Sequence, residues 1–186
     1  MRHGTSGYLT DLLDEIKGTD MTKRIVNLDD LKLDVQKYSD VFEAHMASIA
    51  PLVGGRKLGY RLTVLPPGKK AWPYHAHLAN EEMFFILSGS GLLRYAGAEY
   101  PIRAGDVIAA PAGTEAEAHQ IYNNSAEDLK YLCVSTMVEP DIMLYPDSGK
   151  FGAFAGAAPG GAKDKRTFTY FGRLGTSVDY WSDEGK

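Results

Sequence analysis

Cysteine is almost absent from this chain, because Cys133 is the only cysteine among its 186 residues. A single thiol cannot form an internal disulfide, which excludes a disulfide-stabilised scaffold and is typical of proteins in a reducing cytosol. Cys133 lies in the apolar segment "KYLCVSTMV", so it is predicted to be a small core residue rather than a nucleophile. No apolar run reaches the roughly 20 residues that a membrane-spanning helix needs.

A strong excess of either charge is also missing. The 20 basic and 24 acidic residues leave a net charge of −4, and no helix-turn-helix pattern is evident, so a nucleic-acid partner is not expected. The N-terminus has basic residues but no apolar signal core, which favours a cytoplasmic location. The length and the 44% hydrophobic content fit one compact domain.

The N-terminal quarter of the chain divides into two parts. Residues 1–21 are interpreted as a vector-derived leader or an alternative start, because Met21 opens a segment that resembles a natural start. Residues 22–57 are interpreted as an N-terminal extension. There "KRIVNL" predicts a short strand, and "DVFEAHMASIAPL" has weak helical spacing. Within the leader, four apolar residues repeat at helical spacing and predict one or two amphipathic helical turns. They are Leu9, Leu12, Leu13 and Ile16.

Residues 58–143 contain a succession of short β-like segments. They are rich in β-branched and aromatic residues and are separated by Gly, Pro, Asn and Asp at fairly even spacing. This rhythm favours an all-β sandwich or barrel over alternating strands and helices. The segments are "LGYRLTVL", "EEMFFILSG", "SGLLRYAG", "AEYPIRAG", "DVIAAPAG", "HQIYNN" and "LKYLCVSTM".

Residues 144–186 are expected to form a C-terminal loop, strand and tail. "YPDSGKFGAFAGAAPGGAKDK" is rich in Gly and Ala and predicts an irregular surface loop. "RTFTYFGRL" predicts one more strand, and the tail "VDYWSDEGK" brings aromatic side chains that need a surface to pack on.

Two histidines one residue apart are the strongest chemical signal. On a strand, His75 and His77 point to the same face, with Cα atoms roughly 6.6 Å apart. Along the next strand Glu82, Phe84 and Ile86 share a face, which predicts a polar, solvent-accessible opening of the barrel above an apolar interior. Two imidazoles on one face can converge on a transition-metal ion. Alternatively, the two histidines only flank a loop beside a buried strand.

Glycines, histidines and a glutamate in this stretch resemble the first signature of the cupin superfamily, and a second stretch resembles the other signature. The first match comprises Gly68, His75, His77, Glu82 and Gly89. The second match comprises Gly105, Pro111, Gly113, His119 and Asn123. The interval between Gly113 and His119 is longer than usual in the family, so we expect an expanded loop there. The C-terminal region also looks similar to small bacterial cupins associated with sugar-phosphate isomerisation.

The resemblance implies an antiparallel double-stranded β-helix, the jelly-roll or cupin barrel, with short helical and irregular terminal extensions. It further implies that four residues bind one divalent transition metal ion, Zn, Fe, Mn or Ni. A homodimer is expected, since cupins commonly pair through strands outside the metal site and the terminal strands here could supply such edges. The implied ligands are His75, His77, Glu82 and His119.

Three functions remain open at this stage. The first is a metal-dependent enzyme, of isomerase type, that acts on a small polar substrate such as a sugar or sugar phosphate. The second is an iron-dependent dioxygenase, and the third is a non-catalytic small-molecule-binding protein. An isomerase needs a base, for which Tyr60 and Glu81 are the candidates. Either Tyr60 or Arg61 could face the barrel mouth, and an inward arginine would favour an anionic substrate.

Overall fold

The computed structural model describes residues 24–184, so the predicted leader at 1–21 lies outside the described residues. Between these limits the chain is built almost entirely from β-strands joined by turns and short 3-10 helices. The strands are β1 (Asp34–Lys37), β2 (Glu43–Ser48), β3 (Gly59–Leu65), β4 (Ala76–His77), β5 (Glu82–Ser88), β6 (Ser90–Tyr95), β7 (Ala98–Arg103), β8 (Val107–Ala110), β9 (His119–Tyr122), β10 (Leu129–Ser135), β11 (Asp141–Tyr145), β12 (Lys150–Ala155) and β13 (Phe168–Arg173). The 3-10 helices are η2 (Leu28–Asp30), η3 (Ala50–Val53), η4 (Glu115–Glu117), η5 (Pro146–Ser148) and η6 (Lys163–Lys165).

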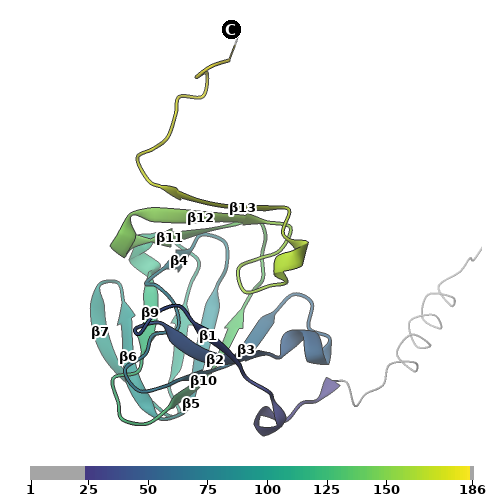
Figure 1. Cartoon of the computed structure of the whole chain (residues 1–186), viewed down its shortest axis with the longest axis vertical. Helices are drawn as coiled ribbons and strands as arrows, with labels where there is room; N and C mark the ends of the chain where they lie inside the picture. The colour runs from purple at the N-terminus through teal and green to yellow at the C-terminus, as the bar shows by residue number, and fades with distance from the viewer. Residues whose placement is uncertain (1–23, 185–186) are drawn as a thin grey trace, which may run out of the picture.

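The strands form three antiparallel sheets with the arrangement of a jelly roll. The largest has the order β1-β2-β3-β10-β5-β8, and the others have the orders β13-β12-β11-β4 and β7-β6-β9. A backbone bridge between His75 and His119 connects the two smaller sheets into the second wall of the barrel. In Figure 1, β11, β12 and β13 lie across the upper end of the barrel. The predicted all-β antiparallel fold is confirmed.

The core lies between the six-stranded and the three-stranded sheets. Side chains from alternate positions of β3, β5 and β10 fill it from one side, and side chains from β6, β7 and β9 fill it from the other. Its buried members include Leu65, Phe84, Ile86, Leu93, Ile102, Ile121, Leu129 and Tyr131. The predicted alternation along β5 is therefore correct, with a dry interior below Glu82.

The end of the barrel away from β4 is closed by Asn123, a residue of the second signature. Its side chain is fully buried, and its Nδ2 donates to the carbonyls of Leu65 and Glu127, each at 2.7 Å. Its Oδ1 accepts from the backbone N–H of Ser125 at 2.9 Å and from that residue's hydroxyl. All of these partners lie within the chain, so Asn123 holds a turn against the barrel.

Three sequence expectations about the terminal regions are wrong. The segment with helical spacing at 40–52 contains strand β2, along which half-buried and buried side chains alternate from Glu43 to Met46. The described part of "KRIVNL" forms no strand and leads into η2. The Gly- and Ala-rich segment begins at the last residue of β11 and contains η5 and all of β12, so only residues 156–162 remain irregular before η6.

The expected strands β3 and β5 to β10 and the late strand β13 are confirmed. Strands β1 and β2 belong to the same sheet as β3 and β10, so the N-terminal extension takes part in the barrel wall. Among the described residues, no helix is long and apolar enough to cross a membrane.

Candidate metal centre

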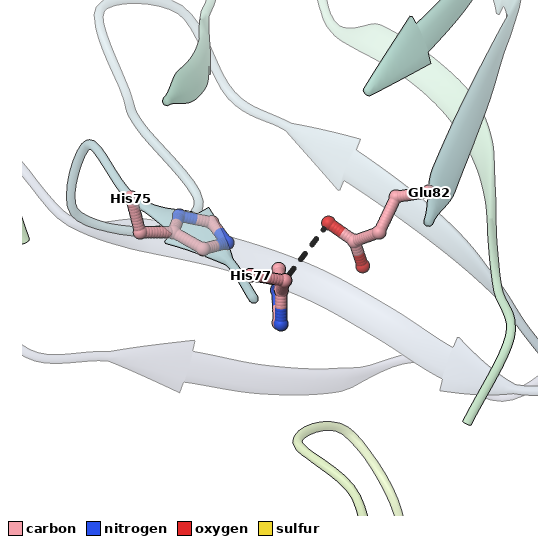
Figure 2. A group of neighbouring side chains, drawn as sticks. All are labelled: His75, His77 and Glu82. Carbon is pink, nitrogen blue, oxygen red and sulfur yellow. Dashed lines mark ion pairs between the residues drawn. The ribbon is translucent and has the colours of Figure 1, made fainter. Parts of the chain in front are cut away.

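Three imidazoles and one carboxylate meet at the β4 end of the barrel. His77 lies on β4 just after His75, Glu82 begins β5, and His119 begins β9. The three histidines are only 3–6% exposed. Figure 2 shows the rings of His75 and His77 and the Glu82 carboxylate directed toward a common space. Four residues from three separate strand ends thus meet because the barrel closes there.

The distances within this group are short. Glu82 Oε2 lies 3.0 Å from His119 Nε2 and 3.6 Å from His77 Nε2. The ligand atoms of His75, His77 and Glu82 all lie within 4.8 Å of one another. The His119 ring centroid is 4.7 Å from that of His75 and 6.5 Å from that of His77. His119 therefore joins the group through Glu82 and His75.

Each imidazole is held by its outer nitrogen. His75 Nδ1 lies 2.7 Å from the carbonyl oxygen of Pro73, and His119 Nδ1 lies 3.2 Å from that of Glu117. A carbonyl oxygen can only accept, so Nδ1 of His75 carries a proton and donates it, whereas His119 has an acceptor on both sides, the Glu117 carbonyl at Nδ1 and the Glu82 carboxylate at Nε2. Nε2 of each ring therefore faces the centre of the group, which is the orientation that a metal ligand requires.

Asp141 holds the third imidazole, and the sequence analysis did not find it. Its Oδ2 accepts from His77 Nδ1 at 2.6 Å, while its Oδ1 accepts from the backbone N–H of Ala79 at 3.0 Å. Asp141 is 1% exposed and begins β11, which pairs with β4 through Met143 and His77. No sequence motif marks Asp141, because it meets His77 only through the pairing of β11 with β4, which are far apart in the sequence.

Electrostatics divides the group into neutral and charged members. Burial, together with repulsion from His119 and His77, lowers the pKa of His75 to about 3. Burial alone would raise the pKa of Glu82, but the His119 hydrogen bond and the nearby imidazoles outweigh it and lower that pKa to about 2. At neutral pH a carboxylate therefore faces the nitrogen lone pair of a neutral imidazole, an arrangement that suits a cation.

His77 differs from His75 because it lies between two carboxylates. Burial lowers its pKa, but the hydrogen bond to Asp141 and the charges of Glu82 and Asp141 outweigh burial and raise it above 6.5. A cation that binds His77 Nε2 must therefore displace a proton that the site itself favours.

The donor set fits a divalent transition metal. Three imidazole nitrogens and one carboxylate oxygen are ligands of intermediate hardness, which suit Zn, Fe, Mn or Ni, and this set leaves coordination positions for water or substrate. The anchored Nδ1 atoms are the feature that separates this group from a chance cluster of polar side chains.

Cys133 contacts the same group from β10. Its Sγ is a weak donor 3.8 Å from Glu82 Oε1. Burial, and then the charge of Glu82, raise the pKa of this thiol well above its ordinary value. Cys133 is therefore a neutral side chain beside the carboxylate, and it packs against the core as expected.

Neither candidate base lies with these residues. Glu81 is exposed and lies just before β5, which begins at Glu82. Tyr60 points out of the barrel, where its hydroxyl packs against the turn at Gly55. Neither Tyr60 nor Glu81 is therefore placed to transfer a proton at the centre of the His and Glu group.

Arg61, whose direction the sequence left open, and Arg94 point to different sides of the barrel wall. Arg61 on β3 pairs across the sheet with Cys133, so it faces the barrel interior. Arg94 on β6 faces outward, stacks 3.8 Å above the Tyr74 ring and makes a bidentate ion pair with Asp147 at 2.7 and 2.9 Å. Of these two arginines, Arg61 is therefore the one that lies on the same side of the barrel wall as the His and Glu group.

Comparison with known proteins places this architecture. The model of the cupin domain matches residues 61–135. An oxalate-binding protein of Thermotoga maritima is 35% identical over 95 residues, which cover 51% of this chain and 74% of that protein. The chain belongs to the cupin superfamily.

Two further cupin-like relatives extend the comparison. Auxin-binding protein 1 of Arabidopsis thaliana is 31% identical over 131 residues, and the match covers 65% of this cupin and 63% of the plant protein. The crystal structure of a proposed sugar phosphate isomerase of Acidithiobacillus ferrooxidans superposes with a TM-score of 0.67 at 29% identity. That superposition covers 72% of this chain and 88% of the other, and so reaches well beyond the residues of the family model.

Proposed function

We propose that this cupin binds one divalent transition metal ion through His75, His77, Glu82 and His119 and acts on a small polar molecule, in an isomerase-type reaction of a sugar or sugar phosphate. The observation that carries the metal proposal is the anchoring of all three Nδ1 atoms, which turns every Nε2 inward. When bound, such an ion would polarise a carbonyl or hydroxyl oxygen of the substrate.

Similarity supports the choice of a small oxygen-rich molecule. The names of the relatives include an oxalate-binding protein and a proposed sugar phosphate isomerase. Both names point to ligands that present carboxylate, hydroxyl or phosphate oxygens, which hard and intermediate metal ions prefer. The fold by itself does not select the reaction, so the assignment rests on the site and on these two relatives.

An iron-dependent dioxygenase is the second candidate, and the positions of Tyr60 and Glu81 favour it. An enediol-type isomerisation needs a base beside the substrate carbon, and both candidates point away from the centre. An oxygenase with a bound iron ion has no such requirement. A non-catalytic binding protein would likewise need only the ion and its ligand.

Metal identity and turnover separate these functions. We would purify the protein from its host without a metal-affinity column, identify the ion, and assay sugar-phosphate isomerisation and oxygen uptake in parallel. Zinc, manganese or nickel with isomerisation supports the first function, and iron with oxygen uptake supports the second. A bound metal without turnover, together with ligand-dependent thermal stabilisation, would leave the binding role.

We also infer a homodimer that forms through β13 and the segment that follows it. β13 is the edge of its sheet, and beyond it the chain runs away from the body of the molecule (Figure 1). Seven large apolar side chains in this region are 52–83% exposed: Phe168, Tyr170, Phe171, Leu174, Val178, Tyr180 and Trp181. Their exposed area is on the order of 800 Å², which is what one partner contributes to a standard interface.

The dimer has a direct test in light scattering. The double variant Tyr180→Ser, Trp181→Ser is expected to shift the mass toward the monomer, because it removes the two largest exposed rings of the tail. Tyr38→Ser is the matched control. Tyr38 is 91% exposed and lies in the β1–β2 turn, far from the C-terminal tail in the sequence. A monomeric wild type, or a double variant of unchanged mass, would contradict the inference.

A further inference from the structure

Arg61 reaches the interior of the barrel at the level of the candidate metal centre. In the register of β3 and β10, Arg61 lies opposite Cys133, and directly opposed side chains share a face with Cβ atoms about 5 Å apart. The thiol of Cys133 in turn lies 3.8 Å from Glu82 Oε1. Cys133 thus lies between the positively charged side chain of Arg61 and the carboxylate of Glu82.

The guanidinium of Arg61 has only weak partners. One nitrogen donates to the carbonyl of Gly160 at 3.2 Å, and another contacts the sulfur of Met46 at 3.8 Å. Its central carbon lies 5.7 Å from the ring of Trp72, which comes just before the two histidines. Among residues 24–184, no carboxylate forms an ion pair with Arg61.

Arg94 shows how this chain treats an arginine with a structural role. It is outward-facing, and Asp147 neutralises it through two parallel hydrogen bonds. Arg61 sits beside buried groups and lacks any such neutralisation, although a partly desolvated guanidinium without an anion is unfavourable. Its five donors form a fork that matches a carboxylate or phosphate. Most of that fork is left for a molecule from outside the chain.

A second arginine holds the same loop. Arg166 donates to the carbonyl of Ala158 at 3.4 Å, two residues before the carbonyl that Arg61 contacts, and packs over the Phe154 ring at 4.9 Å. Its Nε is buried without a hydrogen-bond partner. Two arginines therefore flank the Gly- and Ala-rich loop 156–162, and both retain unused donors. The two guanidinium groups therefore offer more hydrogen-bond donors than the carbonyls of this loop accept.

We propose that Arg61 binds an oxyanionic group of the substrate, a carboxylate or a phosphate, while other oxygens of the same molecule approach the metal centre. Loop 156–162, which rests on Arg61 through Gly160, then borders the bound anion. The proposal deepens the proposed function and rests on it, because it presumes that the His and Glu group and the adjoining space receive one small molecule. It restricts that molecule to small anions and excludes neutral sugars.

The test uses calorimetric titration of the metal-loaded protein with oxalate, with inorganic phosphate and with neutral erythritol. Wild type is expected to bind an anion and not erythritol. Arg61→Gln is expected to weaken anion binding about ten- to a hundredfold, since a charge-assisted, bidentate contact is lost. Arg94→Gln is the matched control and should bind as wild type does. Preference for oxalate assigns carboxylates, and preference for phosphate assigns phosphate esters.

Two additional measurements keep the result unambiguous. Metal content, measured in every sample, separates the two proposals: a wild type without metal overturns the proposed function, whereas Arg61→Gln with full metal and unchanged anion affinity overturns only the role of Arg61. Arg61→Lys keeps the charge without the planar fork and should bind between wild type and Arg61→Gln. A metal-loaded wild type that binds neither anion at millimolar concentrations would also overturn the proposal.

Discussion

The two ends of the barrel both bury polar side chains, but in opposite ways. At the far end, Asn123 satisfies every polar atom of its amide with partners in its own chain. At the β4 end, the outer nitrogens of His75, His77 and His119 bond to groups of the surrounding chain, and their inner nitrogens gather with the Glu82 carboxylate around one space. Buried polarity that is complete within the chain holds the structure, and buried polarity that converges on one space is prepared for a ligand.

Replacement of Asn123 should give the largest loss of stability. Asn123→Ala removes a fully buried amide that donates to the carbonyls of Leu65 and Glu127 and accepts from Ser125, so all of these hydrogen bonds are lost at once. We expect a decrease of about 3 kcal/mol in the free energy of unfolding, measured by urea denaturation, with metal stoichiometry unchanged. The exposed neighbour offers the control Asn124→Ala, which should change stability by only a few tenths of a kcal/mol. Loss of metal in folded Asn123→Ala would break the comparison.

Asp141→Asn should act on the other end without comparable unfolding. The amide keeps the shape of the side chain but removes the charge that holds the His77 Nδ1 proton. Metal affinity is expected to fall ten- to a hundredfold, as for other residues that orient a ligand, measured by competition with a chromogenic chelator. Asp147→Asn, which alters the exposed pair with Arg94, is the control. Equal affinities in the two variants would remove Asp141 from the account.

The pH dependence of stability should be smaller per pH unit than the loss in Asn123→Ala, and it should be specific to His75. Burial and repulsion from His119 and His77 lower its pKa to about 3 in the folded protein, whereas the unfolded chain takes up the proton near 6.5. The unfolded state thus binds more protons between these values, so the metal-free protein loses stability as pH falls from 6.5 toward 3. The slope for this one group is at most about 1.4 kcal/mol per pH unit.

Urea denaturation of metal-free wild type and His75→Gln across this pH range checks the prediction. The variant should show a shallower decrease, because glutamine does not titrate. Parallel curves for the two proteins would mean that His75 takes up a proton in the folded state.

Much of the barrel could be predicted because its signals are local. Strands β3 and β5 to β10 follow from alternation and from turn residues, such as Gly89, whose φ of +81° and close approach to the Asp128 carbonyl permit no side chain. The cluster of His75, His77, Glu82 and His119 follows from two motifs whose strands meet when the barrel closes. These features need no knowledge of distant pairing beyond the fold itself.

The features that could not be predicted depend on long-range pairing. Strand β12 has a Gly- and Ala-rich sequence that is typical of loops, and it is a strand because β11 and β13 flank it. Asp141 meets His77 only through the pairing of β11 with β4. The inward direction of Arg61 depends on its register with β10, and a shift by one residue would have turned Tyr60 inward instead.

The most direct test of the account is the metal content of wild type and His77→Ala, purified side by side without a metal-affinity column. His45→Ala is the matched control, because His45 is a half-exposed histidine on β2 that contacts only Glu43 among the described ion pairs. We expect about one equivalent of a single transition metal in wild type and in His45→Ala and a large loss in His77→Ala. No metal in wild type, or equal metal in all three proteins, would contradict the central claim that the four residues form a metal centre.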